Sequence, residues 1–267
     1  MNENFEHYLK QENMAANTIA SYTFAIRCYE LKYKDWNKKN LLLFKGYLIE
    51  TYQPATVNLR IQALNKYLEF IKKGKLKLQA VKFQQKTFLE NVISNADYCF
   101  LKNCLLKDED WSWYFVVWFL AATGARVSEL IQLKVEHVQA GYFDIYAKGG
   151  KVRRLYIPET LRNETLKWLL KKDYTSGFLF LNRLGGRITS RGIASQLKSI
   201  AKKYGVNVKV VYPHSFRHRF AKNFLEKYND IALLADLMGH DSIETTRIYL
   251  RLTAGEQKEV VNKIITW

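Results

Sequence analysis

The most specific pattern in this sequence lies in two stretches near the C-terminus. They are Pro213-His214-Ser215-Phe216-Arg217-His218 and Met238-Gly239-His240, the latter followed by Thr245-Thr246-Arg247-Ile248-Tyr249. His214 and Arg217 are three residues apart, so a helix would project both from the same face. An imidazole exchanges protons near neutral pH, and a guanidinium stays charged at any working pH. Tyr249 follows His240 by nine residues and is a phenol that a cationic cluster could activate as a nucleophile.

Two earlier stretches could complete a site for a phosphodiester. They are Thr123-Gly124-Ala125-Arg126-Val127-Ser128-Glu129-Leu130, which supplies a second arginine, and Lys148-Gly149-Gly150-Lys151 at the turn of a predicted hairpin. Two guanidiniums suit the negative charge that grows on the non-bridging oxygens when a phosphodiester is attacked. Each stretch alone is a weak signal, since the chain has 17 tyrosines and a hairpin lysine is usually solvated. Their shared order is much more specific.

Together the four stretches resemble the signature of the tyrosine recombinases, the phage integrase and Xer-like family, whose catalytic set runs Arg, Lys, His-x-x-Arg, His, Tyr. The resemblance assigns that set to Arg126, Lys148, His214, Arg217, His240 and Tyr249. It implies that Tyr249 attacks a scissile phosphate and forms a 3′-phosphotyrosine, followed by strand exchange and religation. It also implies that Lys148 is the general acid, with Lys151 as a rival, and that His240 donates to a phosphate oxygen.

Three alternatives share some of these features. Type IB topoisomerases use the same chemistry, but they relax supercoils as monomers without site specificity. The short chain, its helical N-terminal part and the Gly-His pair before Tyr249 favour the recombinase. A DNA-binding protein that had lost activity would be expected to have a broken catalytic set, and all six positions are filled here. An unrelated basic DNA-binding protein would not explain the four ordered motifs.

The charge indicates a nucleic-acid partner. The 267 residues include 42 Lys and Arg against 25 Asp and Glu, a formal charge of +17, and such an excess favours double-stranded DNA. The sequence has no GxxxxGK[ST] phosphate loop and no obvious carboxylate cluster for two metals. We therefore expect a reaction that uses no cofactor, metal or ATP and that proceeds in EDTA.

The cysteines and the apolar stretches indicate a cytoplasmic, nucleoid-associated protein. Cys28, Cys99 and Cys104 are odd in number and lack metal-ligand spacing, so we expect buried thiols in a reducing compartment. The most apolar stretch, 113–122, is about half of the roughly 20 residues that a membrane span needs. It predicts a buried core helix and no membrane partner.

Hydrophobic periodicity predicts a mainly helical protein with a small sheet, in two domains. The resemblance implies that these two domains close on DNA as a clamp. Residues 1–75 form four helices and resemble the family's core-binding domain, residues 76–92 form a linker, and residues 93–267 form the catalytic domain. Catalytic-domain helices are expected at 95–107, 110–123, 159–172, 190–204, 214–226, 230–238, 241–250 and 255–266, with hairpin strands at 142–146 and 153–157.

Several side chains near the catalytic set have two interpretations. Glu129 orients a cationic group or is a surface carboxylate, and the position of His218 suggests packing rather than catalysis. Arg153 and Arg154, like Lys151, could hold phosphates beside the hairpin or be solvated. The hydroxyls and backbone amides at one helix start could cap the helix or bind a phosphate; these are Thr189, Ser190 and Arg191.

In the N-terminal domain, polar side chains on two helices could reach DNA, and the resemblance implies that these helices face the major groove. They are Asn17, Ser21, Tyr22, Asn58, Arg60 and Lys66. A solvated polar face is the alternative for each.

The last helix carries an apolar stripe, made of Val260, Val261, Ile264 and Ile265 and ending at Trp267. In the family that this chain resembles, the last helix packs into a neighbouring subunit. We favour this exchange over folding back, because a terminal apolar helix is free to swap partners. It predicts a homotetramer on a synapsed recombination site with inverted repeats.

Overall fold

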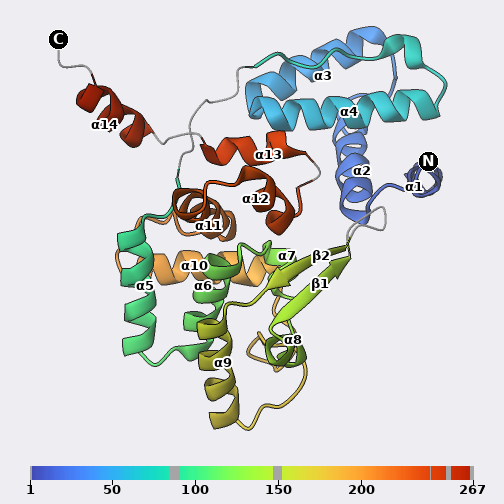
Figure 1. Cartoon of the computed structure of the whole chain (residues 1–267). Helices are drawn as coiled ribbons and strands as arrows, with labels where there is room; N and C mark the ends of the chain where they lie inside the picture. The colour runs from blue at the N-terminus through green and yellow to red at the C-terminus, as the bar shows by residue number, and fades with distance from the viewer. Residues whose placement is uncertain (1, 84–90, 147–151, 241, 251–253, 265–267) are drawn as a thin grey trace. The chain divides into compact units, whose positions relative to one another are not determined.

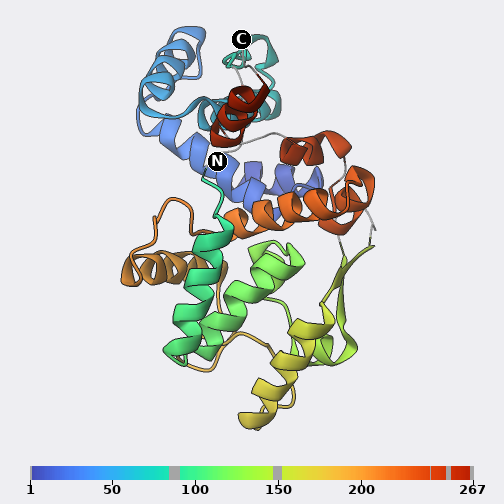
Figure 2. The ribbon, with the colours of Figure 1, turned by 60° about the vertical axis from the view of Figure 1, so that its left-hand side comes forward.

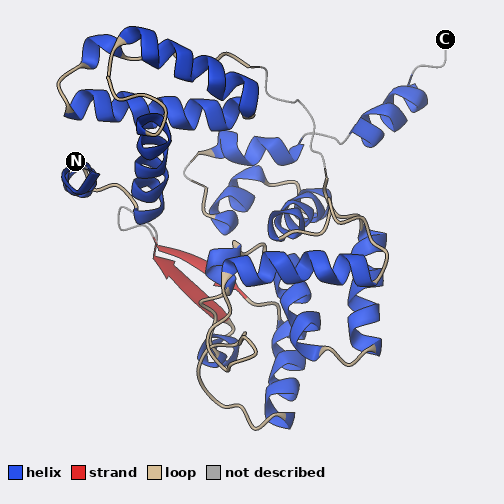
Figure 3. Ribbon diagram, turned by 180° about the vertical axis from the view of Figure 1, so that it is seen from behind, coloured by secondary structure: helices blue, strands red, loops and turns tan. Residues whose placement is uncertain are grey.

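The structure is a computed structural model that describes residues 2–83, 91–146, 152–240, 242–250 and 254–264 (Figure 1). The chain divides into two compact units, Met1–Gln85 and Lys86–Trp267. Each unit has its own apolar core. Helices dominate both units, and the described residues contain one two-stranded sheet (Figure 3). The prediction of a mainly helical chain with a small sheet is confirmed.

The first unit is a bundle whose helices bury their apolar stripes in one core. Its elements are α1 (Asn2–Gln11), α2 (Ala16–Glu30), α3 (Lys38–Thr51), α4 (Pro54–Phe70) and the 3-10 helix η1 (Gly74–Leu76). Helix α4 begins with proline, whose missing N–H has no partner to lose in the first turn. Aromatic rings fill the core: Trp36 lies between Tyr29 and Tyr67, with ring centroids 4.1 and 4.5 Å away.

The chain that leaves this bundle stays on its surface. Asn65 of α4 binds both backbone groups of Leu78, accepting from its N–H and donating to its carbonyl at 2.8 Å each. Asn58 does the same for Val81, at 2.7 and 3.0 Å. Leu78 is buried in the core of the first unit. The beginning of the expected linker is thus packed on the bundle, because two asparagine amides supply the partners that its backbone needs.

The second unit is built around one helix that is apolar on nearly every side. Its elements are α5 (Asn95–Lys107), α6 (Trp111–Thr123), α7 (Val127–Leu130), α8 (Val135–Ala140), β1 (Tyr142–Tyr146), β2 (Val152–Tyr156), α9 (Glu159–Lys171), α10 (Ser190–Lys203), α11 (Pro213–Lys227), α12 (Ile231–Met238), α13 (Ile243–Arg247), the 3-10 helix η2 (Ile248–Leu250) and α14 (Ala254–Ile264). Helix α6 packs against α5, α9 and α11 (Figures 1 and 2). A helix that is apolar all round has to be covered on all sides, so α6 lies at the centre of the core.

The two strands pair antiparallel, with Tyr142 opposite Tyr156 and Tyr146 opposite Val152. Side chains alternate between the faces of the hairpin: Leu155 is buried in the core, whereas Tyr146 is 81% exposed. The second strand begins one residue earlier than expected, at Val152. The predicted turn between the strands lies outside the described residues.

Two expectations need correction, and two short helices were not predicted. The helix expected over 241–250 is interrupted, because α13 is followed by the 3-10 turn η2. Helices α7 and α8 have four and six residues, too few to show a hydrophobic period. The cysteines are free but not buried: Cys99 is exposed and the other two are half-buried, because each lies beside rather than on its helix's core-facing stripe. Among the described helices, none has the length and apolar composition that crossing a membrane requires.

Ser215 generates a stability prediction. Its buried hydroxyl accepts a hydrogen bond from the Ile93 backbone N–H at 2.7 Å, which joins the start of the second unit to α11. Ser215→Ala leaves that N–H without a partner, and we expect a loss of about 1–3 kcal/mol in the free energy of unfolding. Denaturant unfolding followed by tryptophan fluorescence measures it, since five of the six tryptophans lie beyond residue 85. The exposed Ser199→Ala is the control, and equal stability of the two variants would contradict the prediction.

Candidate active site

The turn after α6 places the backbone carbonyl that orients Arg217. Gly124 has a φ of +61°, and a Cβ there would lie 2.5 Å from the Phe220 ring of α11. Only glycine combines this backbone conformation with so close an approach. Because α11 packs so near, the Gly124 carbonyl accepts a hydrogen bond from Arg217 Nη1 at 2.6 Å.

Arg126 precedes the short helix α7 and is held by Glu129 one turn later. The Glu129 carboxylate accepts from the Arg126 backbone N–H at 2.7 Å and from its Nη1 at 2.9 Å. Arg126 Nη2 donates to the Gly239 carbonyl at 3.0 Å. Glu129 is only 5% exposed, so it is not a surface carboxylate, whereas the Arg126 side chain is 37% exposed. The guanidinium is therefore anchored within the protein and still accessible from solvent.

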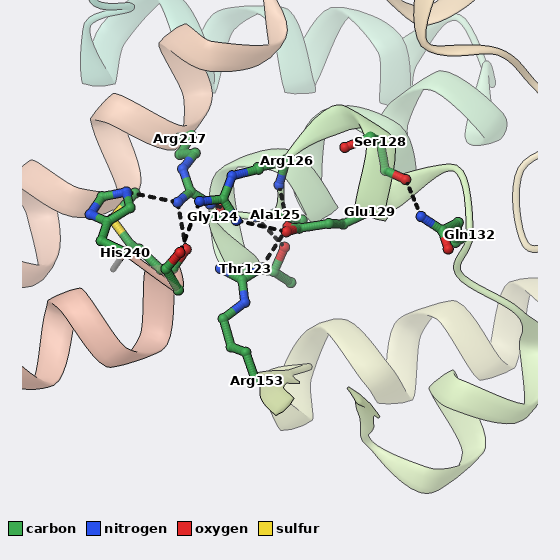
Figure 4. Close-up of polar contacts among 12 residues, drawn as sticks. Thr123, Gly124, Ala125, Arg126, Ser128, Glu129, Gln132, Arg153, Arg217 and His240 are labelled. Atoms are coloured by element: carbon green, nitrogen blue, oxygen red, sulfur yellow. Dashed lines mark hydrogen bonds and ion pairs between the residues drawn. The ribbon is translucent and has the colours of Figure 1, made fainter. Parts of the chain in front are cut away.

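Arg217 of α11 is buried at the centre of the cluster (Figure 4). Its Nη2 donates to the Met238 carbonyl at 2.6 Å and lies 3.0 Å from His240 Nε2. Burial, and after it the nearby positive charge of Arg126, lower the pKa of the Arg217 guanidinium to about 10. A pKa of about 10 leaves this group charged at neutral pH.

His240 and Tyr249 lie beside this guanidinium. The His240 Nδ1 is 2.8 Å from the Thr246 hydroxyl, and its ring stacks on Tyr249 with centroids 6.1 Å apart. Tyr249 is in η2 and is 6% exposed. Burial raises the pKa of its phenol, while the charge of Arg217 and a hydrogen bond from it oppose that rise. A cation in contact with a phenol stabilises the phenolate that a nucleophilic tyrosine has to form.

The two histidines of α11 lie one helical turn apart, and His218 lies beside Tyr249. The rings of His214 and His218 have centroids 6.4 Å apart, and the ring of His218 is 5.4 Å from that of Tyr249. Burial, with Arg217 and Arg126 beyond it, lowers the pKa of His214. Burial lowers the pKa of His218 to about 4. Both imidazoles are therefore neutral at pH 7, and a neutral imidazole can accept a proton.

Arg153 joins the hairpin to this cluster. Its Nη2 donates to Glu129 Oε2 at 2.5 Å, and its side chain is 9% exposed. Figure 4 shows the side chain extending from the strand toward Glu129. The alternative that Arg153 is a solvated strand residue is thus wrong, because its side chain is buried in an ion pair. A contact of Arg153 with a phosphate stays a prediction. Its neighbour Arg154 faces the other way and pairs with Asp144.

The remaining expected residues of the second unit fall into two groups. Lys148 and Lys151 lie outside the described residues. Thr189 caps α10, its hydroxyl accepting from the Gly192 N–H at 3.0 Å, which is the capping role foreseen for it. Ser190 is half-buried and Arg191 is exposed at the start of the same helix.

In the first unit the six expected DNA-contact residues differ in their exposure to solvent and in their contacts within the unit. Asn17 is exposed, and Ser21 and Tyr22 are half-buried on the same helix. Arg60 lies over the rings of Phe24 and Tyr52, at 5.1 and 4.4 Å from their centroids.

The other two side chains are engaged within the unit. Asn58 binds the Val81 backbone, and Lys66 forms ion pairs with Glu12 and Glu69. These contacts give Asn58 and Lys66 roles within the unit, which differ from both a DNA contact and a solvated polar face.

Sequence reasoning missed two kinds of partner. The carbonyls of Gly124, Met238 and Gly239 accept from the two arginines, and no residue type marks a backbone carbonyl for that role. The Thr246 hydroxyl that contacts His240 is six residues away along the chain, a spacing with no recognised signal.

The cluster can therefore bind an anion next to a phenol. Arg126, Arg153 and Arg217 bring three positive charges, and Glu129 brings one negative charge. The anion would meet rigid donors, because each guanidinium is bonded to the backbone or to Glu129. A phosphodiester beside Tyr249 fits this arrangement.

Comparison with known proteins agrees with the geometry. Residues 97–256 match the model of the phage integrase family, which is more than half of the chain. The chain belongs to this family, the tyrosine recombinases, enzymes that break and rejoin DNA strands.

Among its relatives is the tyrosine recombinase XerA of Pyrococcus furiosus, which is 30% identical over 98% of this chain and 92% of its own length. The tyrosine recombinase XerD of Oceanobacillus iheyensis is 28% identical over 97% and 95%. The fold is similar to that of the XerH site-specific recombinase bound to its difH substrate before cleavage. That likeness has a TM-score of 0.70 at 21% identity, covering 98% of this chain and 84% of XerH. These relatives do not favour the topoisomerase alternative.

Gly239 generates a prediction about the site. Its φ is +62°, and a Cβ would lie 2.5 Å from Arg153 Cδ. Gly239→Ala therefore displaces Arg153 and the turn that carries His240, and we expect slower DNA cleavage. The backbone strain itself should cost about 1–2 kcal/mol of stability.

Gly205→Ala is the matched control, because Gly205 has a φ of +70° with nothing within 4 Å of its Cβ position. Both variants should lose similar stability in denaturant unfolding, and only Gly239→Ala should lose cleavage rate. Equal cleavage rates would contradict the packing role of Gly239.

Proposed function

We propose that this chain is a site-specific DNA recombinase in which Tyr249 is the nucleophile. The observation that carries the proposal is the convergence of Arg126, Arg217, His240 and Tyr249 from separate segments of the chain into one cluster. The family membership supports the reaction class. The contacts of these four side chains support their roles, and the roles of Lys148 and His214 rest on the resemblance to the family.

In the first step the Tyr249 oxygen attacks the scissile phosphorus, and the bond from phosphorus to the 5′ oxygen breaks. The phenol gives its proton to neutral His214, and the leaving 5′ oxygen takes a proton from Lys148. Arg126, Arg217 and His240 donate to the non-bridging oxygens, where negative charge accumulates. A 5′-hydroxyl of the partner duplex then attacks the 3′-phosphotyrosine and releases the tyrosine. The two steps conserve the number of phosphodiester bonds, so the chemistry needs no ATP.

The burial of Tyr249 has a mechanistic consequence. With 6% of its surface exposed in the protein alone, the phenol has to move toward the phosphate on DNA binding. Helix η2, a single 3-10 turn beside α11, is the element that would shift. Removal of water from the occupied site would also strengthen the contacts of the guanidiniums.

The proposed DNA clamp uses residues 1–75 as a core-binding domain and residues 93–267 as the catalytic domain. Contacts outside the catalytic set fall to side chains near the solvent: Asn17, Ser21, Tyr22, Arg60, Arg154, Thr189, Ser190 and Arg191. Asn58 and Lys66 are not among them, because their polar groups are bound within the first unit. Lys151 remains a proposed contact from its position in the sequence, three residues after Lys148. The enzyme would act in the cytoplasm, at the nucleoid.

Helix α14 supports a proposed homotetramer on a site with inverted repeats. Its Val261 and Ile264 are 51% and 62% exposed, so this part of its apolar stripe is unburied in the single chain. Apolar side chains on a terminal helix gain stability when a second subunit covers them. Exchange of α14 between subunits would provide that cover and couple neighbouring active sites.

The central prediction concerns the nucleophile. We expect the wild-type protein, mixed in EDTA with nicked duplexes tiled from the DNA flanking its gene, to form a covalent adduct with particular sequences. Tyr249→Phe should form none, because it lacks the attacking oxygen, and should bind the same duplex with unchanged affinity. Denaturing gels measure the adduct, and gel shift measures binding.

The other outcomes have clear meanings. Adducts on every sequence, with relaxation of supercoils, would support the topoisomerase alternative. Binding of the natural site without any adduct would overturn the catalytic proposal in favour of a non-catalytic DNA-binding protein.

The lowered pKa of His214 predicts a pH profile. Neutral His214 accepts the phenol proton, so cleavage should stay constant from pH 8 to pH 7. It should fall on acidification through the pKa of His214, with a midpoint below the ordinary value of 6.5. His214→Gln should be slower and should lack this acidic decline. Single-turnover cleavage of the nicked duplex measures the profile, and an unchanged midpoint in His214→Gln would assign the decline to another group.

A further inference from the structure

Arg153 is a charged residue of β2 whose side chain is buried, and it is not a member of the proposed catalytic set. We propose that Arg153 is a positioning residue that holds Arg126 ready for the phosphate through the shared Glu129 carboxylate, and that braces the His240 turn through Gly239. This inference deepens the proposed function and rests on it.

The contacts of Arg153 point to the site rather than to the fold alone. Its Nη2 donates to Glu129 Oε2, while Oε1 of the same carboxylate accepts from Arg126. Its Cδ occupies the space beside Gly239 that a Cβ would need. The carbonyl of Gly239 is the second anchor of Arg126. One side chain thus contacts both groups that fix Arg126.

The balance of charge explains why a second cation is needed. Glu129 is buried, and a buried carboxylate with a single cationic partner would hold that cation in a close ion pair. With Arg126 alone, the pair would be neutral and its donors would be drawn toward the carboxylate. Arg153 shares the negative charge, so that the three groups carry two positive charges and one negative. Arg126 then keeps attraction for a phosphate while its position stays fixed.

A contribution to the stability of the fold does not explain Arg153 as well as a role in the site does. Its Nε and Nη1 are buried and have no hydrogen-bond partner among the described residues. Buried donors without partners cost stability. Burial also lowers the pKa of this guanidinium, against the opposing effect of Glu129. A charged group in such surroundings is better explained by its action on Glu129 than by a gain in folding energy.

The test is a double-mutant cycle on the nicked duplex that gives the wild-type adduct. We expect Arg153→Gln to slow single-turnover cleavage by about 10- to 100-fold, since a misplaced catalytic group costs that much. DNA affinity should change little. In Arg153→Gln/Glu129→Gln the rate should be no lower than in Glu129→Gln alone, because the carboxylate that captures Arg126 is gone. Arg153→Lys, which keeps the charge, should recover part of the rate.

A second readout separates positioning from a purely structural role. A methylphosphonate at the scissile position removes the negative charge that Arg126 has to meet. The rate ratio of wild type to Arg153→Gln should therefore be closer to one on this substrate than on the phosphodiester. Arg162→Gln is the control. Arg162, like Arg153, lies beside a glycine of positive φ, but its guanidinium binds backbone carbonyls rather than Glu129.

The outcomes distinguish this inference from the proposed function. If the wild type forms no adduct, the proposed function fails. If the wild type cleaves and Arg153→Gln cleaves equally fast, only the role of Arg153 fails. The role of Arg153 also fails if the double variant is slower than either single variant by the product of their effects. It fails as well if the rate ratio is unchanged on the methylphosphonate, or if Arg162→Gln slows cleavage as much as Arg153→Gln.

Discussion

The buried guanidinium of Arg217 is the interaction on which the rest of the site depends. It donates to the carbonyl of Gly124, just past the end of α6, and to that of Met238, the last residue of α12. Carbonyls at the C-terminal end of a helix lack intrahelical donors and carry partial negative charge. One planar cation thus joins the ends of two helices to α11. The segments bearing Arg126, His240 and Tyr249 are brought together as a result.

The same chemistry explains how a protein holds so much positive charge in one place. Arg217 is compensated by carbonyl dipoles, while Arg126 and Arg153 share Glu129. None of the three is fully neutralised. The histidines nearby remain neutral because burial and these cations lower their pKa values. The guanidiniums are therefore held in place before the anion arrives, and little reorganisation of these charges remains when the phosphate binds.

Packing of apolar residues sets the frame for these polar contacts. Helix α6 lies at the centre of the core, and two glycines, Gly124 and Gly239, allow close approaches at the turns that follow α6 and α12. A side chain at either glycine would separate the elements that meet there. The hairpin belongs to the same frame, since Leu155 packs in the core while Arg153, two residues earlier on the same face, reaches Glu129.

Hydrophobic period is a local property of the chain, and it was enough to predict the helical class and most helix bounds. The order of the four motifs and their resemblance to a known signature predicted the six-residue catalytic set. The roles of Glu129, Arg153 and Asn58 could be seen only in the folded chain. The sequence around a charged or amide side chain does not show whether that side chain is solvated or buried against a partner more than 20 residues away along the chain. Its role depends on which distant carboxylate or backbone group folding places within hydrogen-bond reach, and no local pattern records that distance.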